Sequence, residues 1–193
     1  MATINKEYAK ERILEYSEES DRAKLIILLI LKLAGGSLGK TKLFKAFWLA
    51  HLVYSKARPG YLSTWKIVRL PYGPGIHKGD SLILDLKKAG KIQLDHQPRG
   101  PYLETVCKLI NNEFASEKLP QGAVEAITGA LEMVQDSTAT EISDWSHVFS
   151  RSWNRTPNGE ELDIYTDLIP DDVYEERKAL LEEAKEGYDD LFK

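Results

Sequence analysis

The chain has 193 residues, of which 42% are hydrophobic and 29% charged, the composition of a globular protein with room for one core. Its only cysteine, Cys107, excludes a disulfide framework and a cysteine-rich zinc site, so we expect a reducing, cytoplasmic setting. The first twenty residues are charged, and the longest apolar run, Leu25–Leu31, is too short to span a bilayer. We therefore expect neither a signal peptide nor a membrane partner.

The net charge of −4 conceals two oppositely charged parts. Residues 24–108 contain 15 Lys and Arg against 4 Asp and Glu, whereas residues 109–193 contain 7 against 20. Either the two parts fold against each other, or each faces a different partner: nucleic acid for the basic part and a basic protein for the acidic part. We predict one domain, 1–193, with a basic core at 24–110 and an acidic helical extension at 111–193 packed on it.

Hydrophobic spacing and capping residues predict three helices at the beginning of the chain. The first, Asn5–Ser17, is short and charged. The second begins at a cap, Ser20 or Asp21, and ends at Leu33, before two glycines. The third spans Thr41–Lys56, because its apolar residues recur every three or four positions.

The most constrained segment of the chain follows a predicted strand at Leu62–Leu70. In Val68–Gly75, two prolines and two glycines fall within five residues, which forces a rigid, bent backbone. We expect three residues to build this corner: Pro71, Gly73 and Pro74. We expect the exposure of two others to reveal a partner: Arg69 and Tyr72.

A helix at Ile76–Ala89 and a hairpin of strands at Lys91–His96 and Tyr102–Leu109 are predicted after the corner. Helix, helix, strand, helix and hairpin is the order of a winged helix. The acidic part is predicted to be helical, over Pro120–Val134, from a capping box at Thr138 and Glu141 to Phe149, and over 170–188. The expected fold class is α+β, predominantly helical and winged-helix-like, with a small antiparallel sheet.

The segment Ala34–Thr41 matches a relaxed phosphate-binding loop, with alanine at the first position. Lys40 would pair with phosphates, Thr41 would hold magnesium and Asp85 would supply the acidic strand. The flanking sequence favours another interpretation, because the preceding run is rich in leucine and no alternation of strands and helices follows. We therefore expect a turn between two helices over 35–39.

Other catalytic patterns are weaker. The four histidines are scattered without metal-ligand spacing: His51, His77, His96 and His147. Cys107 lies in a strand-like run, which predicts a small buried residue rather than a nucleophile. No nucleophile, base and oxyanion donor can be assembled from the sequence. We predict no enzyme, no catalytic residue, no metal and no cofactor.

Two groups of motifs resemble a known family. The first comprises Leu43–His51, Val68–Pro74 and Leu82–Ile92, and the second comprises Ile142–His147, Trp153 and Asn158–Asp163. They resemble the Panacea domain of bacterial and phage antitoxins and of adaptor-like proteins in proteolysis. The resemblance covers about Leu25–Ile164.

This resemblance implies a non-enzymatic antitoxin that binds and neutralises a cognate, translation-targeting toxin encoded beside it. It also leaves open operator DNA, and a protease or chaperone, as partners. The residues that it implicates in toxin binding, or in scaffolding the loop, are Arg69, Pro71, Tyr72, Gly73, Pro74, His147 and Trp153. We favour a structural interpretation of two of them, with His147 as a buried histidine and Trp153 as an indole tied to the Pro/Gly loop. We expect Trp145 to pack against the protein.

Two alternatives to an antitoxin stay open. A winged-helix regulator would bind DNA phosphates and bases through the basic half, using Lys78, Ser81, Lys87, Lys88 and Arg99. A phosphate-loop nucleotide enzyme would depend on Lys40.

Overall fold

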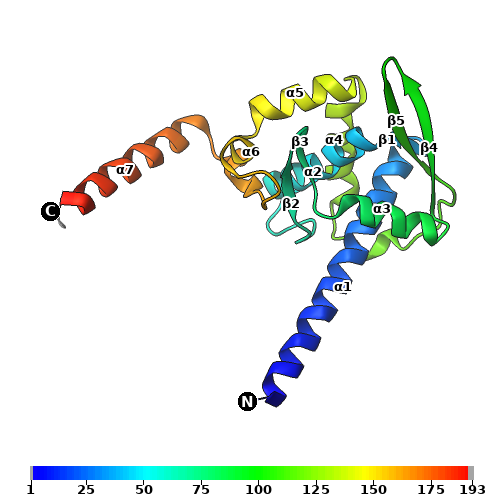
Figure 1. The fold of residues 1–193 in the computed structure, drawn as a ribbon, viewed down its shortest axis with the longest axis horizontal. Coiled ribbons are helices and arrows are strands. Elements are labelled where there is room, and N and C mark those ends of the chain that lie inside the picture. The colour runs from blue at the N-terminus through cyan, green and yellow to red at the C-terminus, as the bar shows by residue number, and fades with distance from the viewer. Residues whose placement is uncertain (1, 191–193) are drawn as a thin grey trace.

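The computed structural model describes the backbone of residues 2–190 and the side chains of residues 15–180 (Figure 1). The elements in chain order are α1 (Ala2–Leu33), β1 (Ser37–Gly39), α2 (Lys40–Ala57), β2 (Ile67–Leu70), β3 (Gly73–Ile76), α3 (Gly79–Lys88), β4 (Ile92–Arg99), β5 (Tyr102–Leu109), α4 (Ala123–Gln135), α5 (Ala139–Phe149), α6 (Arg151–Arg155) and α7 (Asp171–Asp190). Two 3₁₀ turns lie between them: η1 (Ser116–Lys118) and η2 (Ile164–Leu168). The predicted class, predominantly helical α+β with a small antiparallel sheet, is confirmed.

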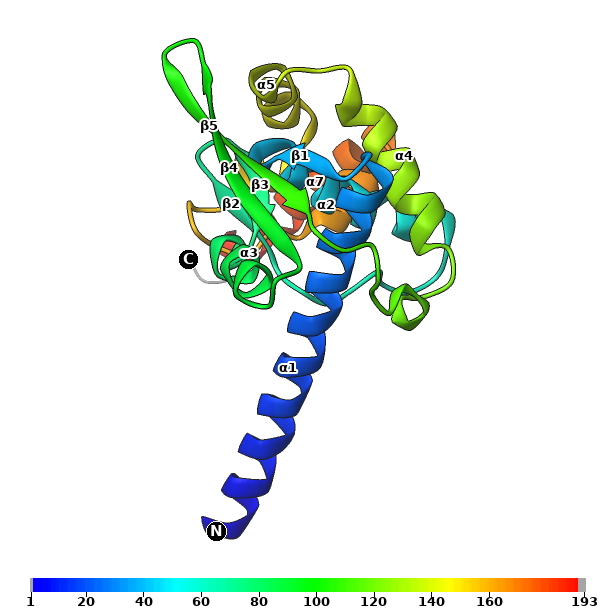
Figure 2. The same ribbon diagram turned by 90° about the vertical axis from the view of Figure 1, so that its right-hand side faces the viewer.

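The strands form two small antiparallel sheets. One has the order β1-β5-β4, and the other consists of β2 and β3 alone. The first sheet ties β1 to the β4–β5 hairpin. The observed order is α1, β1, α2, β2, β3, α3 and the hairpin, so it differs from the predicted order of helix, helix, strand, helix and hairpin by the two additional strands β1 and β3. Figure 2 shows the tip of the hairpin extending beyond the body of the protein.

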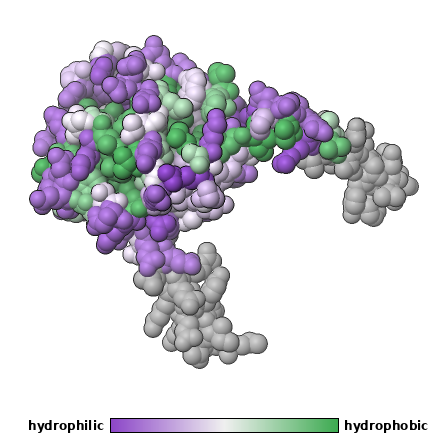
Figure 3. Space-filling model, turned by 180° about the vertical axis from the view of Figure 1, so that it is seen from behind, coloured by the Kyte–Doolittle hydropathy of each residue, from purple (hydrophilic) through white to green (hydrophobic). Residues whose placement is uncertain are grey.

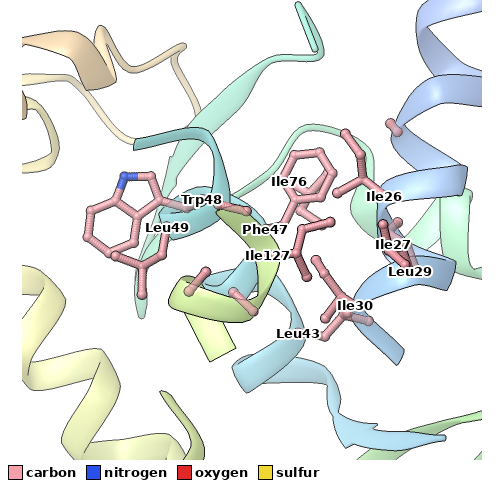
Figure 4. Close-up of a cluster of buried hydrophobic side chains, with 14 of the residues drawn as sticks. Ile26, Ile27, Leu29, Ile30, Leu43, Phe47, Trp48, Leu49, Ile76 and Ile127 are labelled. Atoms are coloured by element: carbon pink, nitrogen blue, oxygen red, sulfur yellow. The ribbon is translucent and has the colours of Figure 1, made fainter. Parts of the chain in front are cut away.

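Helix α2 is the centre of the core. Ten of its residues are buried, from Leu43 to Tyr54. Figure 4 shows its Leu43 and Phe47 packed among isoleucines of α1, with Ile76 of β3 and Ile127 of α4 beside them. An α-helix that is apolar on nearly all sides is stable only where other elements surround it. Helix α4 is one of the elements that surround α2, so it belongs to the central core although its sequence lies in the acidic part.

Helix α1 is continuous, which corrects the prediction of two helices separated near residue 18. Residues 17–21 are Ser, Glu, Glu, Ser and Asp, which contain neither proline nor glycine and can continue a helix. Gly35 and Gly36 then end it: the Gly36 N–H donates to Leu31 O at 2.8 Å, and the Gly35 N–H to Lys32 O at 3.2 Å. Both glycines have positive φ, as helix C-caps require.

The strands around the Pro/Gly segment also differ from the prediction. β2 begins at Ile67 rather than at residue 62, and residues 73–76 form a second strand, β3, that pairs with it. Leu70 faces Gly73, so Pro71 and Tyr72 are the two residues of a tight hairpin turn. The corner is thus a hairpin rather than a bend from a strand directly into a helix, and α3 begins only at Gly79.

In the acidic part, the predicted capping box is present. The Glu141 N–H donates to Thr138 Oγ1 at 3.2 Å and the Thr138 N–H donates to Glu141 Oε2 at 2.7 Å. The short helix α6 was not predicted. Helix α7 extends away from the body (Figure 1), as does the N-terminal half of α1.

Candidate functional site

The β2–β3 turn is held by a buried lysine on α2. Lys45 is only 2% exposed, and its Nζ donates to Tyr72 O at 2.5 Å and to Pro74 O at 3.0 Å. Among the described side chains it makes no ion pair, and burial lowers the pKa of its amine to about 7 because desolvation disfavours the charged form. Lys45 therefore acts as a donor to the turn rather than as a surface charge.

Serines on the buried face of helix α5 also contact this turn. Ser143 Oγ donates to Tyr72 O at 2.7 Å, so this carbonyl accepts two hydrogen bonds. Ser146, fully buried, donates from its Oγ to Ser143 O at 2.7 Å. Gly73, with φ of 95°, lies so close to Lys45 and Ser146 that a Cβ at this position would meet both side chains.

Trp153 ties the turn to α6. Its indole Nε1 donates to Leu70 O at 2.9 Å, so the predicted link between this indole and the loop is confirmed. The start of α6 is held by Asp167, which accepts from the Ser152 N–H at 2.9 Å and from Ser150 Oγ at 2.8 Å. Burial raises the pKa of Asp167 despite these bonds, since desolvation disfavours the carboxylate.

Arg69 and His147 both pack on the indole ring of Trp153. The Arg69 guanidinium lies 4.4 Å from the indole centroid, and the His147 ring stacks on the indole at 4.0 Å and 13°. Arg69 also donates to Thr156 O at 2.8 Å. Burial, and then the positive charges of Lys45 and Arg69, lower the pKa of His147, so its imidazole is neutral at neutral pH. Arg69 is thus used inside the protein rather than presented to a partner.

Segment 159–162 covers the free edge of β2. The Arg69 N–H donates to Glu160 O, the Gly159 N–H to Arg69 O and the Leu162 N–H to Ile67 O, at 2.8–2.9 Å. The two groups of motifs, about 70 residues apart in sequence, therefore meet around one turn. The tip of the turn stays outside these contacts: Pro71 and Tyr72 are both exposed, and Tyr72 is 75% exposed.

Three residues around the turn were not predicted from the sequence: Lys45, Ser143 and Ser146. Lys45 could have been found, because it is the one charged residue between Leu43 and Val53 and interrupts an apolar helix. The two serines could not, because serine is common on any helix surface.

The residues proposed for nucleic acid do not form a uniform basic face. Ser81, Lys87 and Lys88 are exposed on α3, but so are Asp80 and Asp85, which pair with Lys40 at 3.0 Å and Lys24 at 3.9 Å. Two other candidates have partners within the chain. Lys78 Nζ donates to Tyr16 OH at 3.3 Å, and Arg99 pairs with Glu104 at 2.8 Å.

The structure of residues 34–41 differs from that of a phosphate-binding loop, in which backbone N–H groups point at the phosphates. The N–H groups of Gly35 and Gly36 cap α1, and Ser37–Gly39 is a strand, β1, that pairs antiparallel with β5. The prediction of a turn over 35–39 is therefore only partly correct. Lys40 is in its ion pair with Asp80.

Two other reactive residues, Cys107 and His51, lie inside the core. Cys107 is fully buried, and burial raises the pKa of its thiol to about 11. His51 borders a cavity of about 180 Å³, but its Nδ1 must donate to Phe47 O and its Nε2 accepts from Ser63 Oγ. Burial lowers the pKa of His51 to about 4. Within the part of the chain that the structure describes, no group of three or more His, Cys, Asp and Glu could hold a metal ion.

Comparison with protein families, curated proteins and solved structures finds no match to this chain. Among the described residues, no helix has both the length and the apolar character needed to cross a membrane.

Proposed function

We propose that this protein is an antitoxin, which neutralises a cognate protein toxin by direct binding. The observation that carries the proposal is that Tyr72 combines a fixed backbone with an exposed side chain. Its backbone carbonyl is fixed by Lys45 and Ser143, while its side chain is 75% exposed. Exposed aromatic side chains on pre-ordered backbone lose little entropy on binding and are frequent energetic centres of protein interfaces.

The resemblance to the Panacea domain agrees with this arrangement. Its two groups of motifs contact each other through Ser143 and Tyr72, Trp153 and Leu70, and the backbone of Arg69 and Glu160. In this proposal, Arg69, Pro71, Gly73, Pro74, His147 and Trp153 scaffold the turn, and Tyr72 makes the contact.

Co-expression with the product of the adjacent gene tests the proposal. That product should arrest growth alone and lose its toxicity beside this protein. Tyr72→Ala should abolish rescue without changing the midpoint of thermal unfolding. Tyr102→Ala is the matched control, because Tyr102 is 77% exposed on the distant β4–β5 hairpin. A product that is harmless alone, or that stays toxic despite stable co-expression, contradicts the proposal.

A second candidate is duplex DNA binding, favoured by the succession of three helices, α1, α2 and α3, that ends in the β4–β5 hairpin, as in a winged helix. In this role, Lys87 and Lys88 would contact phosphates, so affinity should fall steeply with salt. Titration of labelled duplex at low salt, with the Lys87→Ala/Lys88→Ala double variant alongside, tests it. Absence of binding at low salt removes this candidate.

A further inference from the structure

Helix α5 exposes an aromatic surface on the side away from its buried serines. Trp145, Val148 and Phe149 are 39%, 86% and 42% exposed, and we call these three residues the α5 surface. The rings of Trp145 and Phe149 stack at 4.7 Å and 13°. Clustered exposed aromatic residues are characteristic of binding surfaces rather than of solvated helix faces. In the space-filling view of the face opposite that of Figure 1, apolar residues also gather in patches between hydrophilic ones (Figure 3).

A buried tryptophan supports the α5 surface from within. Trp48 of α2 is fully buried, and its ring lies 6.0 Å from that of Trp145 and 6.1 Å from that of Phe149. Its Nε1 is buried and has no acceptor among the described residues. Buried indole N–H groups normally have one, so the structure leaves an unsatisfied donor beneath the exposed aromatic pair.

The charge carried by α4 and α5 themselves is negative. Lys42 of α2 lies nearby: its Nζ donates to Gln135 O at 3.0 Å, and its charge, after the hydrogen bonds with Thr138, lowers the pKa of Glu141. Residues 123–149 contain five carboxylates and neither lysine nor arginine. All five are exposed, and none forms an ion pair with a described side chain. Two of them, Glu141 and Asp144, each lie one helical turn before a residue of the α5 surface, Trp145 and Val148 respectively, and residues four apart on a helix are neighbours.

We propose that the α5 surface docks a basic amphipathic segment of the toxin. Its apolar side chains would cover Trp145, Val148 and Phe149, and its Lys or Arg residues would pair with Glu141 and Asp144. This inference rests on the proposed antitoxin function and adds the chemistry of the partner. The unpaired carboxylates favour this occupant over nucleic acid or an anionic membrane, both of which they repel.

Titration calorimetry with the purified product of the adjacent gene tests the inference. Val148→Asp should weaken binding at least tenfold, because its carboxylate would lose its water beneath the apolar side chains that cover Val148. Val124→Asp is the control, since Val124 is 49% exposed on α4. The double variant Glu141→Gln/Asp144→Asn should weaken binding and flatten its salt dependence. Glutamine retains the capping box, and circular dichroism checks that each variant is folded.

The outcomes separate the two proposals. If Val148→Asp binds like the wild type while Tyr72→Ala does not bind, the antitoxin function stands and the α5 inference is overturned. If the wild-type chain forms no complex, both are overturned. If sedimentation shows that the wild-type chain alone is a dimer that Val148→Asp dissociates, the occupant is a second copy and the α5 inference is overturned.

Discussion

Lys45 Nζ lies 2.5 Å from the carbonyl oxygen of Tyr72, a residue 27 positions further along the chain. The amine comes from α2, ten of whose residues are buried, and the carbonyl belongs to the turn between β2 and β3. A lysine in such a place carries a desolvation cost whenever it is charged. That cost makes the contribution of Lys45 to folding dependent on pH.

Stability should therefore rise with pH above 7 through Lys45. Its pKa is about 7 in the folded state against 10.5 in the unfolded chain. Between these values the unfolded state binds the additional proton, so the free energy of unfolding increases with pH, by about 1.4 kcal/mol per unit. Lys45→Met keeps an unbranched side chain and removes the proton. Urea unfolding from pH 6 to 9 should show the wild type gaining stability relative to Lys45→Met above pH 7, and parallel curves would contradict this.

Gly73→Ala should destabilise the protein more than Gly60→Ala does. Both glycines have φ of 95°, so both substitutions carry backbone strain of about 1–3 kcal/mol. At Gly60 the added Cβ meets nothing within 4 Å, whereas at Gly73 it would lie 2.5 Å from Lys45 Nζ and closer to Ser146 Oγ. We expect a further loss of about 1–3 kcal/mol at Gly73. Chemical denaturation of the two variants measures the difference. Equal losses would show that Lys45 and Ser146 move aside at no cost.

Trp153→Phe should cost about 1–2 kcal/mol in the free energy of unfolding. Phenylalanine can still pack on His147 and Arg69, but it cannot donate to Leu70 O, which leaves that carbonyl without its indole donor. Trp145→Phe is the control, because Trp145 is partly exposed and phenylalanine retains an aromatic ring there. We expect a change within about 0.5 kcal/mol for Trp145→Phe. Urea unfolding measures both, and similar losses would contradict a special role for the Trp153 hydrogen bond.

The parts of the fold that were predictable depend on local interactions. Helix α2 follows from its apolar spacing, the start of α5 from Thr138 and Glu141, and the hairpin of β4 and β5 from its rigid tip. Strand β1 was not predictable in this way, because its pairing partner is far away in sequence, with Leu38 opposite Cys107. The same holds for β3, whose Gly-Pro-Gly-Ile sequence has no strand propensity of its own.

The candidate site was predictable in outline only. The sequence places Arg69 and Tyr72 in the same rigid segment, and nothing in the sequence distinguishes their ability to reach a partner. Only the fold shows that Arg69 stacks on Trp153, whose position depends on α6 and Asp167. A role that depends on a contact between distant segments cannot be read from spacing along the chain.

The continuity of α1 can be tested by whether one substitution raises or lowers the free energy of unfolding. Ser20 was predicted as a possible N-cap, but it lies inside α1. In a helix interior Ser20→Ala should increase the free energy of unfolding by about 0.5 kcal/mol, because alanine has the higher helix propensity. At an N-cap the same change would decrease it by about 1 kcal/mol. Thr138→Ala, at the N-cap of α5, supplies the reference loss in the same denaturation experiment. If Ser20→Ala loses as much stability as Thr138→Ala, a helix begins at residue 20 and α1 is two helices.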